Sequence, residues 1–458
     1  MVSARNSMGA AQGPRALLRA LLGLALVAVA CSTLAQNAGE VEFSRGVGFA
    51  QTPGSTPRTL GKGLPLKEGD RLTTSDGASA IIRMEDGTRM TVRPNTEIVL
   101  ARYQYKENAQ DNGMLMQLVR GGFRAVTGLI SKSSPHAARV QTSTATIGIR
   151  GTDFDARVCA GDCAAESSRV ASASRPNAPL ASAKVAQGQG EIHAIDAAGQ
   201  RRRLVEGGSI YPGDIVETSA NSRAVLAFRD DSRITVGAGS RFRVDNFVFD
   251  EKNAGEGRFL ATLLRGSVRA LTGLIAKSNN RNVGFSTATA TIGIRGTGFD
   301  ANCVDAGDGC AELSLWTWLG GIEVSRAGDT ALSFLQAGQG LFISPRGVQP
   351  ILNAPSTDGP RPDSVSVDPK LFANEAVSDA DEGLFVFVRD GHIEIATPRQ
   401  ILHLGRNEAG FAGVNGDARR PAVIPKFIEF DKMPLPTARN PLFVSVLNES
   451  NIQQKTCN

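Results

Sequence analysis

The sequence predicts an all-β protein, built from two tandem copies of one folding unit and followed by a small C-terminal β module. One observation is a seven-residue segment, TIGIRGT, which occurs at residues 146–152 and again at residues 291–297. A second is that apolar residues alternate with a period of two, which is typical of strands. A third is composition: 50 Gly and only 5% aromatic residues favour many turns between short strands.

The flanking sequence supports the duplication. Residues 120–130 (RGGFRAVTGLI) align with residues 265–275 (RGSVRALTGLI), with the same offset of 145 residues as the two TIGIRGT segments. We therefore expect one copy at residues 41–166 and a second at residues 184–345.

The first 35 residues have the pattern of a signal peptide. A basic start without acidic residues leads into an apolar run at residues 20–30, and residues 33–35 (TLA) offer a cleavage site before Gln36. The run is too short to span a bilayer, which needs about 20 apolar residues. We expect a periplasmic or secreted protein with no transmembrane helix in the mature chain. The alternative is a lipoprotein acylated at Cys31.

The formal charge of +5 belongs largely to this N-terminal segment. Residues 1–35 contain three Arg and no acidic residue, so the mature chain carries a charge near +2. So small a charge gives no reason to expect nucleic-acid binding.

Four cysteines lie at matching places in the two copies. Cys159 and Cys163 follow the first TIGIRGT segment, and Cys303 and Cys310 follow the second. In an oxidising compartment this pattern predicts one local disulfide in each copy. The alternative, a four-thiolate zinc site, fits poorly because the two pairs have different spacings and lie far apart. Cys457 is left without a partner.

Each copy contains a predicted β-hairpin. In the first copy, Ala80, Ile82 and Met84 alternate before a turn at residues 85–88 (EDGT). The second copy repeats the pattern around the turn at residues 230–232 (DDS). Short alternating strands around such turns are typical of hairpins.

Two segments have a composition that is typical of linkers. Residues 167–183 are rich in Ala, Ser and Pro, and residues 346–381 are rich in Pro.

A C-terminal β module is expected at residues 382–430. Residues 384–395 (LFVFVRDGHIEI) predict a tight hairpin around Asp-Gly and echo residues 315–324 near the end of the second copy. This module would be a partial third unit. Residues 431–458 form a tail to which the sequence assigns no role.

The repeated segments resemble the FecR-like periplasmic domain, named for the ferric-citrate regulator. The shared features are a Gly-Asp entry followed by Thr (residues 69–74), an Asp-Gly-Thr hairpin (residues 86–88), a Thr-Ala-Thr-ϕ-Gly-ϕ-Arg-Gly-Thr-x-Phe strand and a closing strand pair. The second copy has all four, with Asp231-Ser232 at the hairpin. The signature residues are Gly148, Arg150, Gly151, Thr152, Phe154, Gly293, Arg295, Gly296, Thr297 and Phe299.

The resemblance covers about residues 41–345. It implies a solenoid-like stack of short strands or β-hairpins, an envelope location, and a role in sensing, signalling or protein contact. Regulators of this family carry a cytoplasmic helical anti-sigma segment before a membrane span. Only about fifteen residues precede the apolar run here, too few for a folded domain. Direct relay to a sigma factor is therefore not expected.

Arg150 and Arg295 are the most prominent charged residues, because each lies within an apolar strand. A charge inside a β core must be paired, so each is expected in an ion pair or a carbonyl clamp. Asp155 and Asp300 follow five residues later. The alternative is an Arg that meets an anionic ligand or partner.

No metal site, cofactor or catalytic centre is expected. Asp153 is replaced by Gly298 in the second copy, so a two-carboxylate metal site would not be shared. Residues 305–309 (DAGDG) read as a turn. The glycines of the signature segment read as β-bulge positions, since no P-loop Lys follows them. The four histidines show no metal-ligand spacing, and His392 is expected in a turn. No catalytic motif is present, so we expect a protein that is not an enzyme.

Trp316 and Trp318 are the only tryptophans, and their alternation places both indoles on one side of a strand. Core packing is one interpretation. The other is an exposed stacking platform for a sugar or a partner. The sequence thus predicts a sensory or adaptor module that binds another envelope protein. The alternative is a polysaccharide-binding or structural scaffold protein that uses these two tryptophans.

Overall fold

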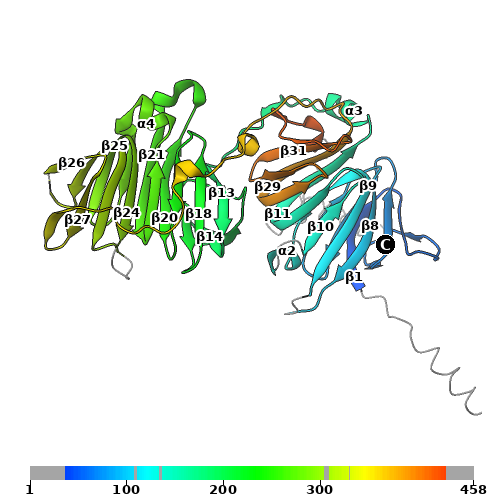
Figure 1. The fold of residues 1–458 in the computed structure, drawn as a ribbon. Helices are drawn as coiled ribbons and strands as arrows, with labels where there is room; N and C mark the ends of the chain where they lie inside the picture. The colour runs from blue at the N-terminus through cyan, green and yellow to red at the C-terminus, as the bar shows by residue number, and fades with distance from the viewer. Residues whose placement is uncertain (1–36, 108–110, 134–136, 304–308, 330, 430–458) are drawn as a thin grey trace, which may run out of the picture.

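Two β-rich domains lie side by side in the computed structural model (Figure 1). The structure describes residues 37–107, 111–133, 137–303, 309–329 and 331–429. The predicted signal peptide with Cys31, Cys457 and the tail at 431–458 lie outside the described residues, as does most of the turn expected at 305–309. In the described ranges, no helix has the length and apolar character needed to cross a membrane.

The first domain is a 15-stranded sheet. Its N-terminal strands are β1 (Asn37–Arg45), β2 (Gly48–Gln51), β3 (Arg58–Thr59), β4 (Pro65–Lys67), β5 (Arg71–Thr74), β6 (Ser79–Met84), β7 (Arg89–Val92), β8 (Glu97–Gln104), β9 (Gly113–Val126), β10 (Ala138–Gln141) and β11 (Thr146–Cys159). Its C-terminal strands are β29 (Gly383–Ala396), β30 (Ile401–Leu404), β31 (Glu408–Gly413) and β32 (Ala418–Arg419). Two short helices accompany it, α2 (Ile130–Ser133) and α3 (Cys163–Ser168).

The second domain is a 16-stranded sheet. Its strands are β13 (Ala183–Gln189), β14 (Ile192–Ile195), β15 (Arg201–Leu204), β16 (Ser209–Ile210), β17 (Ile215–Thr218), β18 (Arg223–Phe228), β19 (Arg233–Val236), β20 (Arg241–Val248), β21 (Arg258–Arg265), β22 (Ser267–Leu271), β23 (Val283–Ser286), β24 (Ala290–Cys303), β25 (Leu313–Arg326), β26 (Leu332–Gln336), β27 (Gln339–Ser344) and β28 (Gly347–Ile351). It also contains α4 (Leu274–Ser278), η1 (Glu251–Glu256) and η2 (Asn280–Asn282).

The two sheets have the same strand connections. The hairpin β6–β7 of the first domain corresponds to β18–β19 of the second, as the alternating pattern predicts. The single strand β9 corresponds to the successive strands β21 and β22, which accounts for the different strand totals. The all-β fold and the duplication are therefore both present.

The C-terminal strands do not form a third unit. β29 pairs antiparallel with β11, from Thr146 opposite Ala396 to Cys159 opposite Gly383. β25 pairs with β24 in the same register in the second domain. Residues 383–419 thus complete the first sheet, and the second domain is inserted into the first. This differs from the separate module expected at 382–430.

Residues 384–395 also differ from the expected hairpin, because they lie in the continuous strand β29. The β11–β29 pairing is irregular on either side of the pair Asp153–Asp390, and Gly391, at one of these bulges, has φ of +92°. Gly391 faces a second bulge at Gly151, whose φ is +55°, and a Cβ on Gly391 would lie 2.5 Å from the Gly151 carbonyl oxygen. Of the signature glycines, Gly151 and Gly296 lie at bulges with positive φ, as the sequence suggests, whereas Gly148 and Gly293 lie in regular strand pairing.

Each domain has its own apolar core, and a third small core lies on the outer side of β29. Leu384 and Val386 of β29 point into the first core, while Phe385 and Phe387 point into the third. A strand buried on both faces has a continuous apolar sequence rather than an alternating one, which is why LFVFV lacks a clear period.

The predicted linkers pack against the domains. Within residues 167–183, β12 (Arg175–Pro176) pairs with β33 (Val423–Ile424). Asn177 is fully buried, and its side-chain amide donates to the carbonyl oxygens of Ala409 and Pro421. The Pro-rich segment contains η3 (Pro362–Ser364) and η4 (Pro369–Leu371), and η5 (Lys426–Glu429) follows β33.

Candidate functional site

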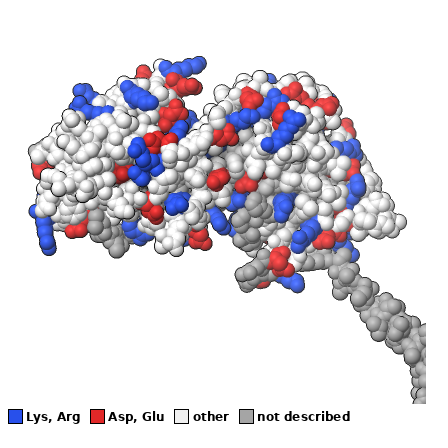
Figure 2. Space-filling model, in the orientation of Figure 1, with Lys and Arg blue, Asp and Glu red and all other residues white. Residues whose placement is uncertain are grey.

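A cleft of about 530 Å³ lies between the two domains. Its first wall comes from the signature bulge of β11 and the bulge of β29, and its second wall comes mainly from β15. The acidic side chains that line the cleft are those of Asp196 and Asp390. Six cationic side chains also line it: Lys132, Arg150, Arg201, Arg202, Arg203 and Arg406. On the molecular face drawn in Figure 2, by contrast, acidic and basic side chains are interspersed over both domains.

Most of these cations are held by a carboxylate. Arg202 donates to both oxygens of Asp214, just as Arg58 is paired with Asp70 in the first domain. Arg406 lies 2.7 Å from Asp390. These arginines keep the shape of the cleft through fixed ion pairs.

Arg203 and Lys132 differ, because the described part of the chain contains no hydrogen-bond or ion-pair partner for either side chain. Both side chains are exposed at the cleft. They supply the positive charge that an incoming acidic group would meet.

The two domains are joined by a buried ionic cluster. Lys184 of β13 lies 2.8 Å from Glu408 of β31, and Arg420 donates to the same Glu408 oxygen at 3.1 Å. Burial lowers the pKa of Lys184 to about 8. Burial opposes ionisation of Glu408, but the charges of Lys184 and Arg420 outweigh it and hold the pKa of Glu408 below its ordinary value. The pair is therefore charged at neutral pH.

Tyr211 adds a second contact between the domains. Its hydroxyl accepts a hydrogen bond from the backbone N–H of Arg406 at 2.7 Å. The guanidinium groups of Arg202 and Arg406 lie 5.3 Å and 5.1 Å from the ring centroid. These contacts of Tyr211 hold the two domains together beside the cleft.

The signature arginines are both paired with a glutamate on the neighbouring strand. Arg150 lies 3.3 Å from Glu394 of β29, and Arg295 pairs with Glu323 of β25. Burial lowers the pKa of Arg150; Glu394 opposes this shift and the nearby charge of Arg203 adds to it. Only Arg150 lines the cleft.

The sequence model of the FecR protein family matches residues 70–174 and 214–317. The chain is a tandem FecR-domain protein. The first matched region ends just before β12 and the second ends inside β25. The family match therefore includes both signature segments and leaves out β29–β32.

Solved structures give weaker similarities. A candidate anti-sigma factor from Parabacteroides distasonis ATCC 8503 is 13% identical, with a TM-score of 0.24 in each of two crystal structures. The alignment covers 30% of this chain and 58% of that chain. Sqt1 from Saccharomyces cerevisiae is 8% identical with a TM-score of 0.09, over 85% of this chain and 98% of that one. No curated protein matches the chain.

Asp155 and Asp300 are buried at equivalent places in the two FecR domains. Asp155 accepts from Arg389 Nε at 2.7 Å, and Asp300 accepts from Arg269 Nε and Trp318 Nε1, each at 3.1 Å. Burial raises the pKa of both carboxyl groups despite these cations. Both are structural anchors of the signature strand.

The replacement of Asp153 by Gly298 has a steric cause. Asp153 pairs with Arg124 at 3.0 Å in the first FecR domain. In the second, the ring of Trp318 fills this space, and a Cβ on Gly298 would lie 2.3 Å from it. Asp153 and Asp155 thus each form an ion pair with an arginine in the first FecR domain.

Trp318 is covered by the protein itself. Both tryptophans are half-buried on the outer side of β25, while Thr317 between them faces the core. The guanidinium of Arg361, from the Pro-rich segment, lies 4.1 Å from the Trp318 ring centroid. The same segment is held by a hydrogen bond of 2.9 Å from Thr235 Oγ1 to the Pro360 carbonyl. In the stacking platform expected from Trp316 and Trp318, one face of the Trp318 ring is therefore occupied by Arg361.

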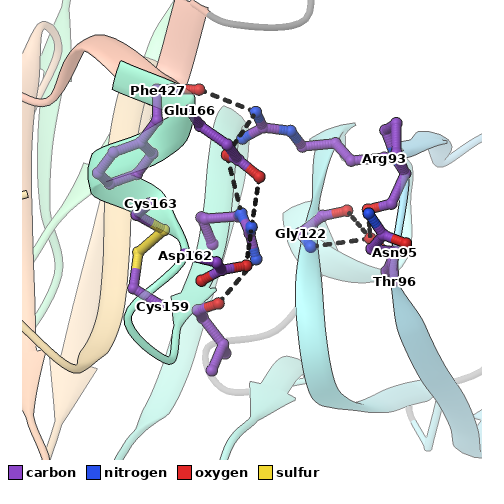
Figure 3. A network of polar contacts seen from close by, with 12 residues as sticks. Arg93, Asn95, Thr96, Gly122, Cys159, Asp162, Cys163, Glu166 and Phe427 are labelled. Atoms are coloured by element: carbon purple, nitrogen blue, oxygen red, sulfur yellow. Dashed lines mark hydrogen bonds and ion pairs between the residues drawn. A yellow bond between two sulfur atoms is a disulfide. The ribbon is translucent and has the colours of Figure 1, made fainter. Parts of the chain in front are cut away.

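Both expected disulfides are formed, Cys159–Cys163 and Cys303–Cys310, with Cα–Cα distances of 5.6 Å and 4.9 Å. The first lies beside a polar network that is shown in Figure 3. The buried guanidinium of Arg157 donates to Asp162 at 2.6 Å and to Glu166 at 2.5 Å. This network fixes α3 to the strand that ends at Cys159.

Another part of the network reaches the C-terminal region. Arg93 donates to the Phe427 carbonyl at 2.8 Å and lies 3.6 Å from Glu166 (Figure 3). It thereby ties the disulfide loop to η5.

Sequence reasoning missed one cluster. His392 lies in β29 and His403 in β30, with Nε2 of the first 3.4 Å from Nδ1 of the second. Burial lowers the pKa of both histidines, so both rings are neutral at pH 7. Eleven residues separate them, and only the pairing of β29 with β30 brings them together.

Proposed function

We propose that this protein is an exported, non-enzymatic sensory or adaptor module that acts by binding another envelope protein. The observation that carries the proposal is the interdomain cleft, in which the signature segment of the first FecR domain faces β15 of the second. A site formed by two packed domains is a common place for recognition. The FecR family match is consistent with a regulatory role.

The charges of the cleft favour an acidic partner segment. Arg203 and Lys132 project from opposite walls without a carboxylate of their own within the described residues. An acidic loop or terminus that entered the cleft would pair with both. Arg150 and Arg406, already held by Glu394 and Asp390, would add fixed positive charge.

The paired arginines of the lining favour binding. Arg202 and Arg406 are engaged in ion pairs and in contacts with Tyr211, so they act as fixed groups. Fixed positive charges of this kind suit recognition of an acidic segment.

The test is capture of partners from envelope extracts by the immobilised mature protein. The variant Lys132→Glu combined with Arg203→Glu reverses the charge on both walls, and a specific partner should be lost from the capture. Arg346→Glu, in the exposed turn between β27 and β28, is the matched control and should retain it. Equal capture by all three proteins would show that the cleft is not the binding site.

A further inference from the structure

His392, Glu394 and His403 form a compact group at the edge of the cleft. Each offers one ligand atom, and these three atoms lie within 4.8 Å of one another. In the described part of the chain, this is the one group of three or more such side chains with that geometry. Two strands fix it, because Glu394 lies directly opposite His403 in the β29–β30 pairing.

The second FecR domain provides an internal comparison. Gly321 occupies the place of His392, since Arg295 is opposite Gly321 in the second domain as Arg150 is opposite His392 in the first. Phe334 occupies the place of His403, since it is opposite Glu323 as His403 is opposite Glu394. The glutamate and its arginine are present in both domains. The framework therefore needs neither histidine, and their joint presence in the first domain calls for another explanation.

The spacing of the ring nitrogens suits a shared cation. Two nitrogens bound to one Zn²⁺ at about 2.0–2.1 Å with tetrahedral angles lie about 3.3–3.4 Å apart. The separation of His392 Nε2 from His403 Nδ1 is 3.4 Å. Two histidines and a glutamate with an open fourth position are a known ligand set for zinc.

The hydrogen bonding of the ring of His392 is incomplete. Its Nδ1 is buried and has no hydrogen-bond partner within the described residues. Whichever tautomer it adopts, the contact with His403 satisfies only one of its two nitrogens. An unsatisfied buried polar group destabilises the folded state, so stability does not explain the histidine pair.

The surrounding charges are mixed. Arg150 takes one oxygen of Glu394, and Lys184 and Arg150 both act electrostatically on the two histidines, which opposes a dication. The negative charge of Glu206, in the second domain, opposes the effect of Lys184 and Arg150 on the pKa of His403. The second domain also closes over this ring, because a Cβ on Gly207 would lie 2.1 Å from it. An ion at this place would lie at the seam between the domains.

We infer that His392, Glu394 and His403 bind a late first-row divalent cation, with Zn²⁺ as the representative ion. Imidazole nitrogens select such ions over Mg²⁺ and Ca²⁺, which prefer oxygen ligands. The site is independent of the acidic partner proposed above. Because the second domain packs against His403, the bound ion should stabilise the contact between domains.

The experiment is a titration of the metal-free mature protein with ZnCl2 against a chromophoric chelator, followed by thermal unfolding with and without ZnCl2. The wild type should bind one Zn²⁺ and show a Tm that rises with the Zn²⁺ concentration. His392→Gly and His403→Phe introduce the residues that the second domain carries at these places. Each should weaken binding at least tenfold, and the double variant should lose both binding and the Tm shift.

Two further variants keep the test decisive. Glu394→Gln preserves side-chain volume and should also weaken binding, so it replaces the histidine variants if these fold poorly. His193→Ala, in β14 of the second domain, removes a histidine outside the cluster and should bind as the wild type does. Absence of Zn²⁺ binding by the wild type, or equal affinity in the wild type and the double variant, overturns the inference. Equal affinity for Mg²⁺ also overturns it.

Discussion

Lys184 and Glu408 form an ion pair across the domain boundary in which both side chains are completely buried. Lys184 belongs to the second domain, and Glu408 follows it in sequence by more than two hundred residues, in the strand that closes the first domain. The pair therefore holds the inserted domain against the one that surrounds it in sequence.

The first prediction concerns this ionic cluster. Glu408→Gln leaves both Lys184 and Arg420 buried without their carboxylate and should cost about 3–5 kcal/mol of unfolding free energy. Lys184→Met should cost less, since Glu408 keeps Arg420 at 3.1 Å. Urea unfolding followed by circular dichroism measures both, and the reverse order of effects would contradict this division of roles.

The second prediction concerns the different neighbours of the signature strands. Trp318 and Arg389 occupy the same bulge position in the two FecR domains. Gly298→Asp should destabilise the second domain, since Trp318 fills the space. Adding Trp318→Arg recreates the first domain's arrangement and should recover part of the loss. A double-mutant cycle on unfolding free energies measures this coupling; simple additivity would argue against the steric explanation.

The third prediction concerns the cover on Trp318. Arg361→Ala removes the guanidinium from the ring and should reduce stability by about 0.5–1 kcal/mol. The emission of the two tryptophans, both in the second domain, should change at the same time. Arg346→Ala is the control and should alter neither quantity. An unchanged emission spectrum for Arg361→Ala would show that the contact is not maintained in solution.

The fourth prediction concerns pH. Burial raises the pKa of Asp300 above 3.8, so the folded state takes up a proton at a pH where the unfolded state remains ionised. Because of this proton uptake, the contribution of Asp300 to the unfolding free energy becomes more favourable as pH falls from 7 toward 3.8. The stability of the wild type relative to Asp300→Asn should therefore increase over this range, by about 1.4 kcal/mol for each unit of pKa shift. Tryptophan emission during urea unfolding at several pH values measures it, and a constant difference would contradict the raised pKa.

The fifth prediction concerns the network in Figure 3. Glu166→Gln removes a charged partner from buried Arg157 but leaves Asp162, so the expected cost is about 1–3 kcal/mol. Asp162→Asn should cost less, because its side chain is 52% exposed. Chemical denaturation of both variants with the disulfide intact measures the costs. Equal costs would mean that burial of the partner does not matter here.

Local sequence was sufficient for much of the fold. The TIGIRGT repeat and the period-two pattern predicted two related all-β units, and the matching cysteine positions predicted the two disulfides. Bulges were predicted at the signature glycines, and they occur at Gly151 and Gly296, whose φ values of +55° and +66° Gly adopts more readily than other residues. These features depend on a few neighbouring residues, so local sequence is enough to predict them.

Other features depended on contacts between distant segments. The apolar strand at 384–395 has the composition of a buried strand, but nothing in it states that β11, more than two hundred residues earlier, is its partner. The covering of Trp318 by Arg361 likewise joins segments that are far apart in the chain. The contact of His392 with His403 depends instead on the register of the consecutive strands β29 and β30.

The sequence by itself determined the duplicated β unit, its turns and bulges, and the cysteine pairs. Only the tertiary structure decided which strands close the first domain, where the cleft lies, and which side chains share it. The physical reason is that backbone hydrogen bonds between strands are chemically alike for every sequence. The choice among possible partners is made by how whole faces pack, and this is not encoded in any single segment.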